Sequence, residues 1–184
     1  MEELFSSRLR AFAVRTVNDA TWTVTRATAT DVETVRGTLE EAARRITAKG
    51  ISQWQPGSFH AAVIAAAIAR GEVYLAWQGD EAIGTLALQW ADPVIWSDVP
   101  DDGSYVHKLA VREAYAGRGI GLWLLRWAGG AVATAGRQYL RLDCMAENTA
   151  LCAWYRRAGF TDRGIVHGQG WSARRFEKAV HSCP

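Results

Sequence analysis

The chain has 184 residues, of which 49% are hydrophobic and 22% charged, and its formal net charge is +2. These values are typical of one soluble globular domain; no apolar run approaches the ~18 residues of a membrane-spanning helix, and the scattered basic residues form no nucleic-acid-binding stripe. Three cysteines without metal-ligand spacing, and no secretory signal, favour a reducing, cytoplasmic environment.

We interpret residues 1–20 as an N-terminal extension and residues 21–184 as a single domain. The extension could form a short helix over residues 4–17, with its apolar side chains facing inward. Such a helix would dock on the domain or on a second subunit, or the segment would be disordered.

The first elements expected in the domain are a strand and a helix, followed by a loop. Thr21–Arg26 is rich in β-branched residues and is predicted to form the strand. Thr30 and Glu33 have the spacing of a capping box, so a helix is expected to begin there and to end near Gly50. Proline and glycine then predict a loop over residues 50–57.

Hydrophobic periodicity and turn residues predict the remaining elements. In chain order they are a helix over 59–70, a hairpin of strands 73–77 and 82–90, a loop over 92–103, a strand over 105–111, a helix over 120–136, a strand over 139–143, a helix over 148–158 and two final strands over 160–166 and 171–178. Strands and helices in this order indicate a mixed α/β domain.

The stretch Tyr105–Gly121 combines a buried strand, a glycine-rich turn and the start of a helix. Amide groups in the first turn of a helix have no intrahelical partner, and the helix dipole adds partial positive charge there. Gly117 and Gly119 allow an anion to approach the main chain closely, and Arg118 adds a permanent positive charge. The stretch therefore predicts a phosphate or pyrophosphate site.

The spacing of the glycines argues against two common phosphate-binding motifs. A Walker loop requires Lys-Ser or Lys-Thr after its last glycine, whereas Leu122 and Trp123 follow here. A dinucleotide fingerprint requires a third glycine at the position of Leu122 or Leu124.

The same stretch resembles the acyl-CoA-binding motif of the GNAT superfamily, the acetyl-CoA-dependent N-acyltransferases. In this family a strand that often ends in Leu-Ala-Val precedes Gln or Arg, two further residues, and Gly-x-Gly or Gly-x-Ala. Leu109-Ala110-Val111 and Gly119-Ile120-Gly121 match this pattern, whereas Ala116 stands at the Gln or Arg position. The departure removes one side-chain contact and leaves the main-chain cradle.

A second block of residues resembles another motif of the family. Asn148, Tyr155 and the pair Gly159-Phe160 have the expected spacing, although Leu151 replaces the usual alanine. Two motifs at the expected separation are more specific than one, and the resemblance covers about residues 23–179.

The resemblance implies a GNAT fold, in which a central, mostly antiparallel sheet is flanked by helices on both faces. Its fourth and fifth strands, 105–111 and 139–143, are expected to splay apart and hold the CoA arm. The resemblance implies acetyl-CoA as co-substrate and no metal. The residues expected to bind acetyl-CoA are Leu109, Ala110, Val111, Ala116, Gly117, Arg118, Gly119, Ile120, Gly121, Asn148 and Tyr155.

Catalytic roles follow from the same resemblance and from the chemistry of acetyl transfer. Tyr155 is expected near the CoA sulfur, where a phenol can donate a proton to the departing thiolate, and the Leu109 amide is expected to meet the oxyanion. His107 is the candidate for removing the ammonium proton, because an imidazole can accept a proton near neutral pH. The alternatives are Glu147, Asp101 or Asp102, or a chain of water molecules.

Four residues are expected to contact the acceptor substrate. In GNAT folds the loop over residues 50–57 and the helices beside it cover the acceptor, which points to Gln53 and Trp54. Tyr105 and His107 on the strand are expected to face the same space. Carboxylates in the loop over residues 92–103 would attract a cationic amine.

The leading interpretation is an N-acetyltransferase that transfers an acetyl group from acetyl-CoA to a primary amine of a small molecule, by direct attack in a ternary complex. A peptide or protein N-acetyltransferase and a non-catalytic CoA-binding module are the alternatives. No nucleic-acid or membrane partner is expected, and the resemblance makes a homodimer possible. The acceptor itself is not identified by the sequence, because acceptor specificity depends on loop conformation.

Overall fold

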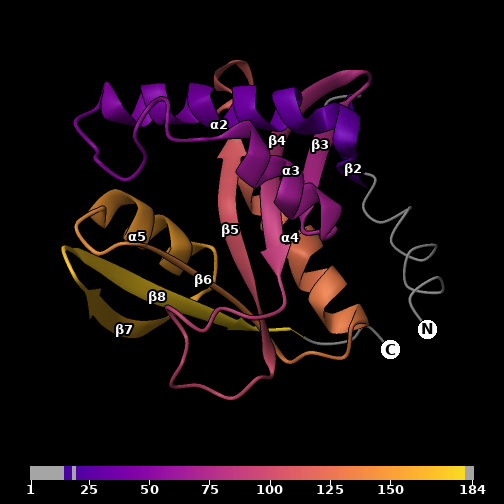
Figure 1. The fold of residues 1–184 in the computed structure, drawn as a ribbon. Helices are drawn as coiled ribbons and strands as arrows, with labels where there is room; N and C mark the ends of the chain where they lie inside the picture. Colours follow the sequence, from indigo (N-terminus) through magenta and orange to yellow (C-terminus); the bar gives the residue numbers. More distant parts are fainter. Residues whose placement is uncertain (1–14, 18–19, 181–184) are drawn as a thin grey trace.

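The computed structural model describes residues 15–17 and 20–180, which form one mixed sheet and four α-helices (Figure 1). The strands are β1 (Arg15–Val17), β2 (Ala20–Arg26), β3 (Val73–Gln78), β4 (Glu81–Gln89), β5 (Gly103–Val111), β6 (Tyr139–Met145), β7 (Thr161–Gly168) and β8 (Trp171–Ala179). Their order is β1-β2-β3-β4-β5-β6-β8-β7, and among these described strands only β5 and β6 pair in parallel. The predicted mixed, mostly antiparallel sheet is confirmed.

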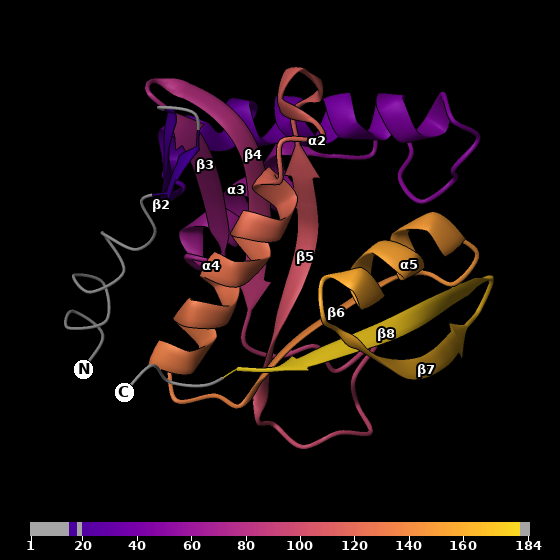
Figure 2. The ribbon, with the colours of Figure 1, turned by 180° about the vertical axis from the view of Figure 1, so that it is seen from behind.

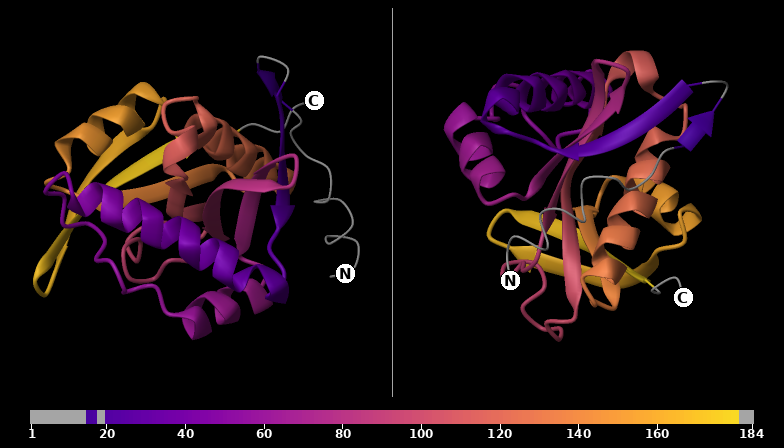
Figure 3. Two further views of the ribbon diagram at one scale, coloured as in Figure 1. Left: turned by 90° about the horizontal axis from the view of Figure 1, so that it is seen from above. Right: turned by 90° about the vertical axis from the view of Figure 1, so that its right-hand side faces the viewer.

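The helices cover both faces of the sheet. The helices α2 (Val32–Thr47) and α3 (Ala61–Ala69) pack on one face, and α4 (Ile120–Thr134) packs on the other (Figures 2 and 3). The helix α5 (Thr149–Arg157) lies beside β6 and β8 and joins the core beneath α4. None of the described helices is both long and apolar enough to cross a membrane.

The N-terminal part of the fold differs from two predictions. Residues 4–14 of the predicted short helix lie outside the described residues, and Arg15–Val17 form a strand because they pair with β2 at the edge of the sheet. The capping box lies earlier than expected: the Thr28 amide donates to Oδ2 of Asp31 over 2.7 Å. Glu33 instead forms a salt bridge with the arginine one turn later in α2.

The strands β5 and β6 separate partway along their length. Residues 103–106 pair with residues 139–142, and beyond them both strands continue without pairing to each other. In Figure 2, β6 and β8 lean away from β5 above the point where the strands meet. The strand edge of β5 is therefore open over residues 107–111, where its N–H and C=O groups can pair with a ligand.

A β-bulge on the opposite edge of β5 changes the direction of the strand at the same level. The register between β4 and β5 shifts between Thr85 and Ala87, so that Lys108 and Leu109 oppose the single residue Leu86. Lys108 has a φ of 50° and is the one non-glycine residue with positive φ in the described part of the chain. Such a conformation costs roughly 1–3 kcal/mol and is found most often at functional sites.

Candidate active site

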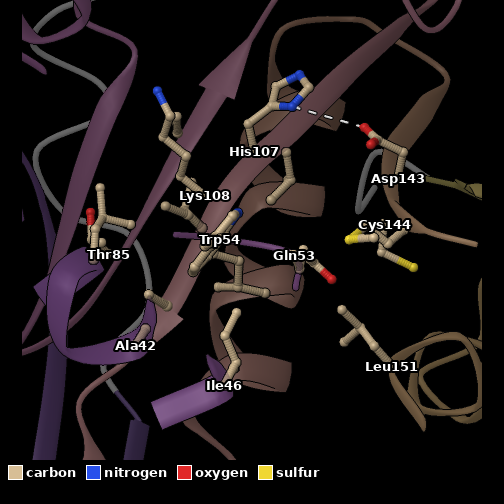
Figure 4. A pocket seen from close by; sticks show the side chains of 18 of the residues that line it. Ala42, Ile46, Gln53, Trp54, Thr85, His107, Lys108, Asp143, Cys144 and Leu151 are labelled. Carbon is tan, nitrogen blue, oxygen red and sulfur yellow. Dashed lines mark ion pairs between the residues drawn. The ribbon is translucent and has the colours of Figure 1, made fainter. Parts of the chain in front are cut away.

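A cavity of about 730 Å³ opens where β5 and β6 separate. The helices α2 and α3 and the loop over residues 50–57 form one side, and β6, α5 and β8 form the other. Residues 106–111 of β5 all line the cavity and lie between the two sides (Figure 4). The predicted splay thus contains a space large enough for a small ligand.

The glycine turn before α4 adjoins this cavity through Gly121. Gly117 and Gly119 have φ values of 78° and 84°, and a Cβ built on either would meet no atom within 4 Å. The space in front of both glycines is therefore open, and the first-turn amides of α4 have no partner within the helix. The turn has the geometry of an anion site at a helix N-terminus.

Arg118 lies beside the glycine turn and is held by its neighbours. Its Nη2 donates to the carbonyl oxygen of Ala114 over 2.9 Å, and its guanidinium lies 4.9 Å from the centroid of the Tyr115 ring. Ala116 has an extended backbone, with ψ of 146°, and its amide donates to the carbonyl of Glu113. The positive charge at the turn therefore comes from a positioned arginine as well as from the helix.

His107 lies between two carboxylates in the cavity wall. Its Nδ1 is 3.9 Å from Oδ1 of Asp143 (Figure 4). Its Nε2 is 3.4 Å from Oδ2 of Asp92. Asp92 has a side chain that is 8% exposed, and its Oδ1 accepts hydrogen bonds from the amides of Val94 and Ile95. Burial raises the pKa of Asp143, against the opposing effect of His107 and with a smaller contribution from Asp92.

The position of His107 and Asp143 follows from the sheet register. The last pair between β5 and β6 is Val106 with Leu142, so His107 and Asp143 are the first residues of each strand beyond the paired region. Their side chains can turn toward each other because no ladder hydrogen bonds hold the strands together there.

The ligand atoms of Asp92, His107 and Asp143 lie within 4.8 Å of one another, a spacing that a metal ion can also use. A metal ion binds one nitrogen of an imidazole, whereas here each nitrogen faces a different carboxylate. The arrangement therefore fits a histidine held for proton transfer better than three ligands directed at one ion.

Tyr155 lines the cavity from α5. Its side chain is 6% exposed and packs against the rings of Trp154, Phe160 and Phe176. Burial holds the pKa of Tyr155 well above the ordinary value of a phenol, so the hydroxyl keeps its proton. That hydroxyl has no hydrogen-bond partner among the described residues and is available to a ligand.

Two buried cysteines lie close to Tyr155. The Sγ atoms of Cys144 on β6 and Cys152 on α5 are 3.6 Å apart, and both thiols are free. Burial raises the pKa of Cys144, which lines the cavity, so it remains a thiol at neutral pH. A protonated, buried thiol is a poor nucleophile.

The loop over residues 50–57 closes one side of the cavity. Gln53 and Trp54 both line it, and Oε1 of Gln53 accepts a hydrogen bond from Nδ2 of Asn148 over 3.0 Å. Asn148 also caps α5, because its Oδ1 accepts from the Leu151 amide over 3.2 Å. A single side chain at the start of α5 therefore ties the loop to the far side of the cavity.

Glu40 fixes the other end of this loop to α2. Its buried carboxylate accepts hydrogen bonds from the amides of Gly57 and Phe59 over 2.8 Å and 3.3 Å. Trp54 meets the Phe59 ring edge-on, with centroids 5.6 Å apart. The apolar loop residues consequently pack over α2 and α3 at the cavity.

Tyr105 does not line the cavity, which differs from its expected contact with the acceptor. Its side chain is 3% exposed, its ring lies 6.0 Å from that of Trp96, and its hydroxyl accepts a hydrogen bond from Arg141. Tyr105 and His107 are on the same face of β5, but Trp96 of the loop after β4 packs against the Tyr105 ring. Tyr105 is thus part of the buried support beneath the site.

Three of the four acids in the loop over residues 92–103 are paired with arginines, and the fourth, Asp92, contacts His107. Asp98 binds Arg175, Asp101 binds Arg137 over 2.6 Å, and Asp102 binds Arg141 over 2.7 Å. Neutralised in this way, they hold the loop to the sheet. Exposed Glu147, an alternative base, accepts a hydrogen bond from Ser172 over 2.7 Å and does not line the cavity.

Four residues at the site were given no catalytic or specific binding role from the sequence: Arg45, Lys108 and Asp143, which line the cavity, and Asp92, which contacts His107. The one signal that could have identified Asp143 was an acid within β6, whose other residues are apolar or aromatic apart from Arg141, because half-buried strands seldom contain carboxylates. Arg45, Asp92 and Lys108 carried no such signal, since their positions depend on the path of a loop, on the bulge and on how α2 packs.

The strand fork and the open glycine turn have the geometry of a site for a ligand that carries a phosphate group and an extended arm, as an acyl-CoA does. Residues 39–160 match the model of the acetyltransferase (GNAT) family, and the chain belongs to this family. It is an acetyl-CoA-dependent acyltransferase.

The chain is similar to known proteins over most of its length. It is 30% identical over 160 residues to the uncharacterized N-acetyltransferase YesJ of Bacillus subtilis strain 168, which covers 82% of this chain and 86% of that protein. A GNAT acetyltransferase from Listeria monocytogenes has the same fold, with a TM-score of 0.77, 22% identity and coverage of 91% of this chain and 100% of that one. The PaiA N-acetyltransferase of Thermoplasma acidophilum, solved with coenzyme A, gives a TM-score of 0.69, 18% identity and coverage of 86% and 99%.

Proposed function

We propose that this enzyme transfers an acetyl group from acetyl-CoA to a primary amine of a small molecule, by direct attack within a ternary complex. The observation that carries the proposal is the position of His107, whose ring nitrogens lie 3.4 Å and 3.9 Å from the carboxylates of Asp92 and Asp143 at the fork of β5 and β6. Its Nε2 is buried without a hydrogen-bond partner among the described residues. A proton acceptor is needed where an ammonium must become a nucleophile, and this histidine lines the cavity at that point.

The glycine turn and the open edge of β5 are proposed to hold acetyl-CoA. The turn from Ala116 to Gly121 would bind the pyrophosphate through main-chain amides, and Arg118 would add its charge. The unpaired backbone of Leu109, Ala110 and Val111 would pair with the amides of the pantetheine arm. The Leu109 amide, which follows the bulge, is proposed to donate to the oxyanion.

The proposed chemistry has three steps, of which the first and the last transfer protons. His107 takes a proton from the bound ammonium, and Asp92 and Asp143 stabilise the imidazolium that forms. The free amine then attacks the thioester carbonyl, the C–N bond forms, and the C–S bond breaks as the tetrahedral intermediate collapses. Tyr155 donates its proton to the departing thiolate, since its hydroxyl is neutral and has no hydrogen-bond partner among the described residues. The second proton, which the new amide nitrogen must lose, restores the Tyr155 hydroxyl, and the proton on His107 passes to solvent.

Direct attack is favoured over an acetylated enzyme intermediate. Cys144 and Cys152 share the buried cluster that contains Tyr155, and the raised pKa of Cys144 keeps its thiol protonated. A hydroxyl or thiol without an adjacent base reacts slowly with a thioester. The transfer therefore requires both substrates to be bound together.

A small acceptor is favoured over a peptide chain by the link across the cavity. The hydrogen bond between Gln53 and Asn148, with Glu40 fixing the loop behind it, narrows the opening between the loop and α5. A peptide would have to pass this link or break it. A protein acceptor remains the alternative, and its signature would be turnover of peptides that exceeds turnover of the matching free amines.

The test is release of free CoA thiol from acetyl-CoA in the presence of an amine panel, with wild type and His107→Gln. We expect acetylated amine and CoA in equal amounts from wild type, and a kcat about 10²–10⁴ lower in the variant because a general base is removed. Acetyl-CoA stabilisation of both proteins in thermal unfolding is the control for folding. Equal kcat in the two proteins would exclude His107 as the base, and binding without turnover of any amine or peptide would favour a non-catalytic CoA-binding module.

A further inference from the structure

The cavity contains two positive charges that no carboxylate of the described residues binds in a salt bridge. Lys108 on β5 and Arg45 on α2 both line it. Neither forms a salt bridge or a side-chain hydrogen bond with any described residue. The other cavity-lining arginine, Arg70, is held by Glu72 over 2.7 Å. Two unpaired cations in one part-buried cavity call for an anion from outside the chain.

Lys108 is brought into the cavity by the β-bulge. In a regular strand His107 and Lys108 would point to opposite faces of the sheet, and one of them would leave the cavity. The bulge and the φ of 50° let both line it, on either side of β5: Figure 4 shows His107 directed toward Asp143 and Lys108 directed away from it. The nearby carboxylate of Glu72 does not serve as a partner of Lys108, because it is already hydrogen-bonded to Arg70 and Gln89. The hydrogen bond from Arg70 is the main cause of the lowered pKa of Glu72, and Lys108 adds a smaller electrostatic effect.

Arg45 supplies the second charge from the side of α2. Its residue is half-buried, and its Nη1 is buried without a hydrogen-bond partner. A guanidinium is always charged and offers several N–H donors, so a buried and unpaired one is unfavourable unless a ligand accepts from it.

The part of the cavity wall that α2, α3 and the loop over residues 50–57 contribute is largely apolar. Leu39 and Ala42 of α2, Ile64 and Ala67 of α3 and Trp54 of the loop line the cavity on the side of Lys108. An apolar wall with a few charged groups selects ligands by the position of their charges, because each buried charge must find a partner.

We propose that the acceptor of this enzyme is an amine that also carries an anionic group, a carboxylate or a phosphate, on an apolar body, and that Lys108 binds this anionic group. The inference rests on the proposed acetylation of a small amine. The ammonium lies at His107 and Asp143 on one side of β5, and the anionic group lies at Lys108 on the other. The acceptor therefore extends across the strand, with its apolar part against Trp54.

The same anion chemistry could come from a phosphate of acetyl-CoA, and the experiment distinguishes the two sources. We would compare straight-chain alkylamines with ω-amino acids of equal chain length, which differ in a terminal methyl or carboxylate. The protein variants are wild type, Lys108→Met, Lys108→Arg and Arg45→Met. Lys49→Met, which changes an exposed lysine outside the cavity, is the matched control.

We expect wild type to prefer the carboxylate by at least about 10-fold in kcat/KM at one or more chain lengths, as expected for a charge-assisted hydrogen bond. Lys108→Met should reduce this ratio below about 3-fold by raising KM for the ω-amino acid, while KM for acetyl-CoA and for the alkylamine stays the same. Lys108→Arg should retain part of the preference, and Lys49→Met all of it.

Three results would overturn the inference without affecting the proposed function. They are equal kcat/KM for both series at every length, a carboxylate preference that survives in Lys108→Met, and a Lys108→Met variant whose one defect is a higher KM for acetyl-CoA. Thermal unfolding with CoA and each compound gives a second readout that does not need turnover. There the ω-amino acid should stabilise wild type more than the alkylamine does, and Lys108→Met should remove the difference.

Discussion

Gly119 and Gly136 lie just outside opposite ends of α4 and allow a matched pair of substitutions. Their φ values are 84° and 76°, and a Cβ at either position would meet no atom within 4 Å. Alanine in this left-handed region costs about 1–2 kcal/mol. For 184 residues the entropy of unfolding is about 0.4 kcal/mol/K, so Gly119→Ala and Gly136→Ala should each melt about 3–5 °C below wild type.

Acetyl-CoA should separate the two variants. At about 100 times its Kd the ligand adds ~2.7 kcal/mol, which corresponds to a rise in Tm of about 7 °C in wild type and in Gly136→Ala. In Gly119→Ala the new Cβ projects into the open space where we place the pyrophosphate. A Kd raised about 10-fold removes ~1.4 kcal/mol, or about half of that rise.

The assay is thermal unfolding of the three proteins with and without acetyl-CoA, followed by calorimetric titration to obtain Kd. Equal losses of Tm in the absence of ligand show that the two alanines have the same backbone cost. If Gly119→Ala were then stabilised by acetyl-CoA as strongly as Gly136→Ala, the main chain of the glycine turn would not be the phosphate site. The proposed path of the cofactor along β5 would have to be abandoned.

Two further predictions concern the cavity. Tyr155→Phe should lower kcat about 10–100-fold and leave acetyl-CoA affinity almost unchanged, because it removes a proton donor and keeps the ring; steady-state kinetics with an unchanged kcat would refute this role. Asp143→Asn should raise Tm at pH 7 and have a smaller effect near pH 4. Because the folded-state pKa of Asp143 is raised, its contribution to stability is present at low pH and is lost as pH rises through that pKa. Thermal midpoints of both proteins across this range test the sign, and a Tm difference that grows toward low pH would contradict it.

Most of the fold could be predicted because its elements have strong local patterns. The strand over 105–111, the helix over 120–136 and the final strand pair correspond to β5, α4, β7 and β8 within a few residues. The N-terminal capping box was misplaced because Thr28 and Thr30 are both good caps, and the choice depends on where β2 ends. The strand Arg15–Val17 was missed because three residues are too few for a pattern, and its pairing is decided by the free edge of β2.

The cavity could be predicted only where main-chain geometry or motif spacing determines it. Glycines with positive φ have a local cause, so the turn was identifiable from the sequence. The partners of His107 were not, because Asp92 comes from a loop and Asp143 from a strand that is adjacent only in three dimensions. The bulge at Lys108 was equally hidden, since a lysine in a strand has no tendency toward positive φ.

The strand β6 explains why the reactive groups lie at the fork. Its period of two places Arg141 and Asp143 on one face: Arg141 is opposite Tyr105 in the paired region, and Asp143 is the first residue beyond it. Arg141 is 2% exposed and binds Glu177 and Asp102, so the closed end of the fork is fixed by buried ion pairs. At the open end the carboxylate of Asp143 has no arginine partner among the described residues; it lies near His107 and lines the cavity. On β6, therefore, the arginine that fixes the sheet and the carboxylate that faces the cavity are only two residues apart, on the same face of the strand.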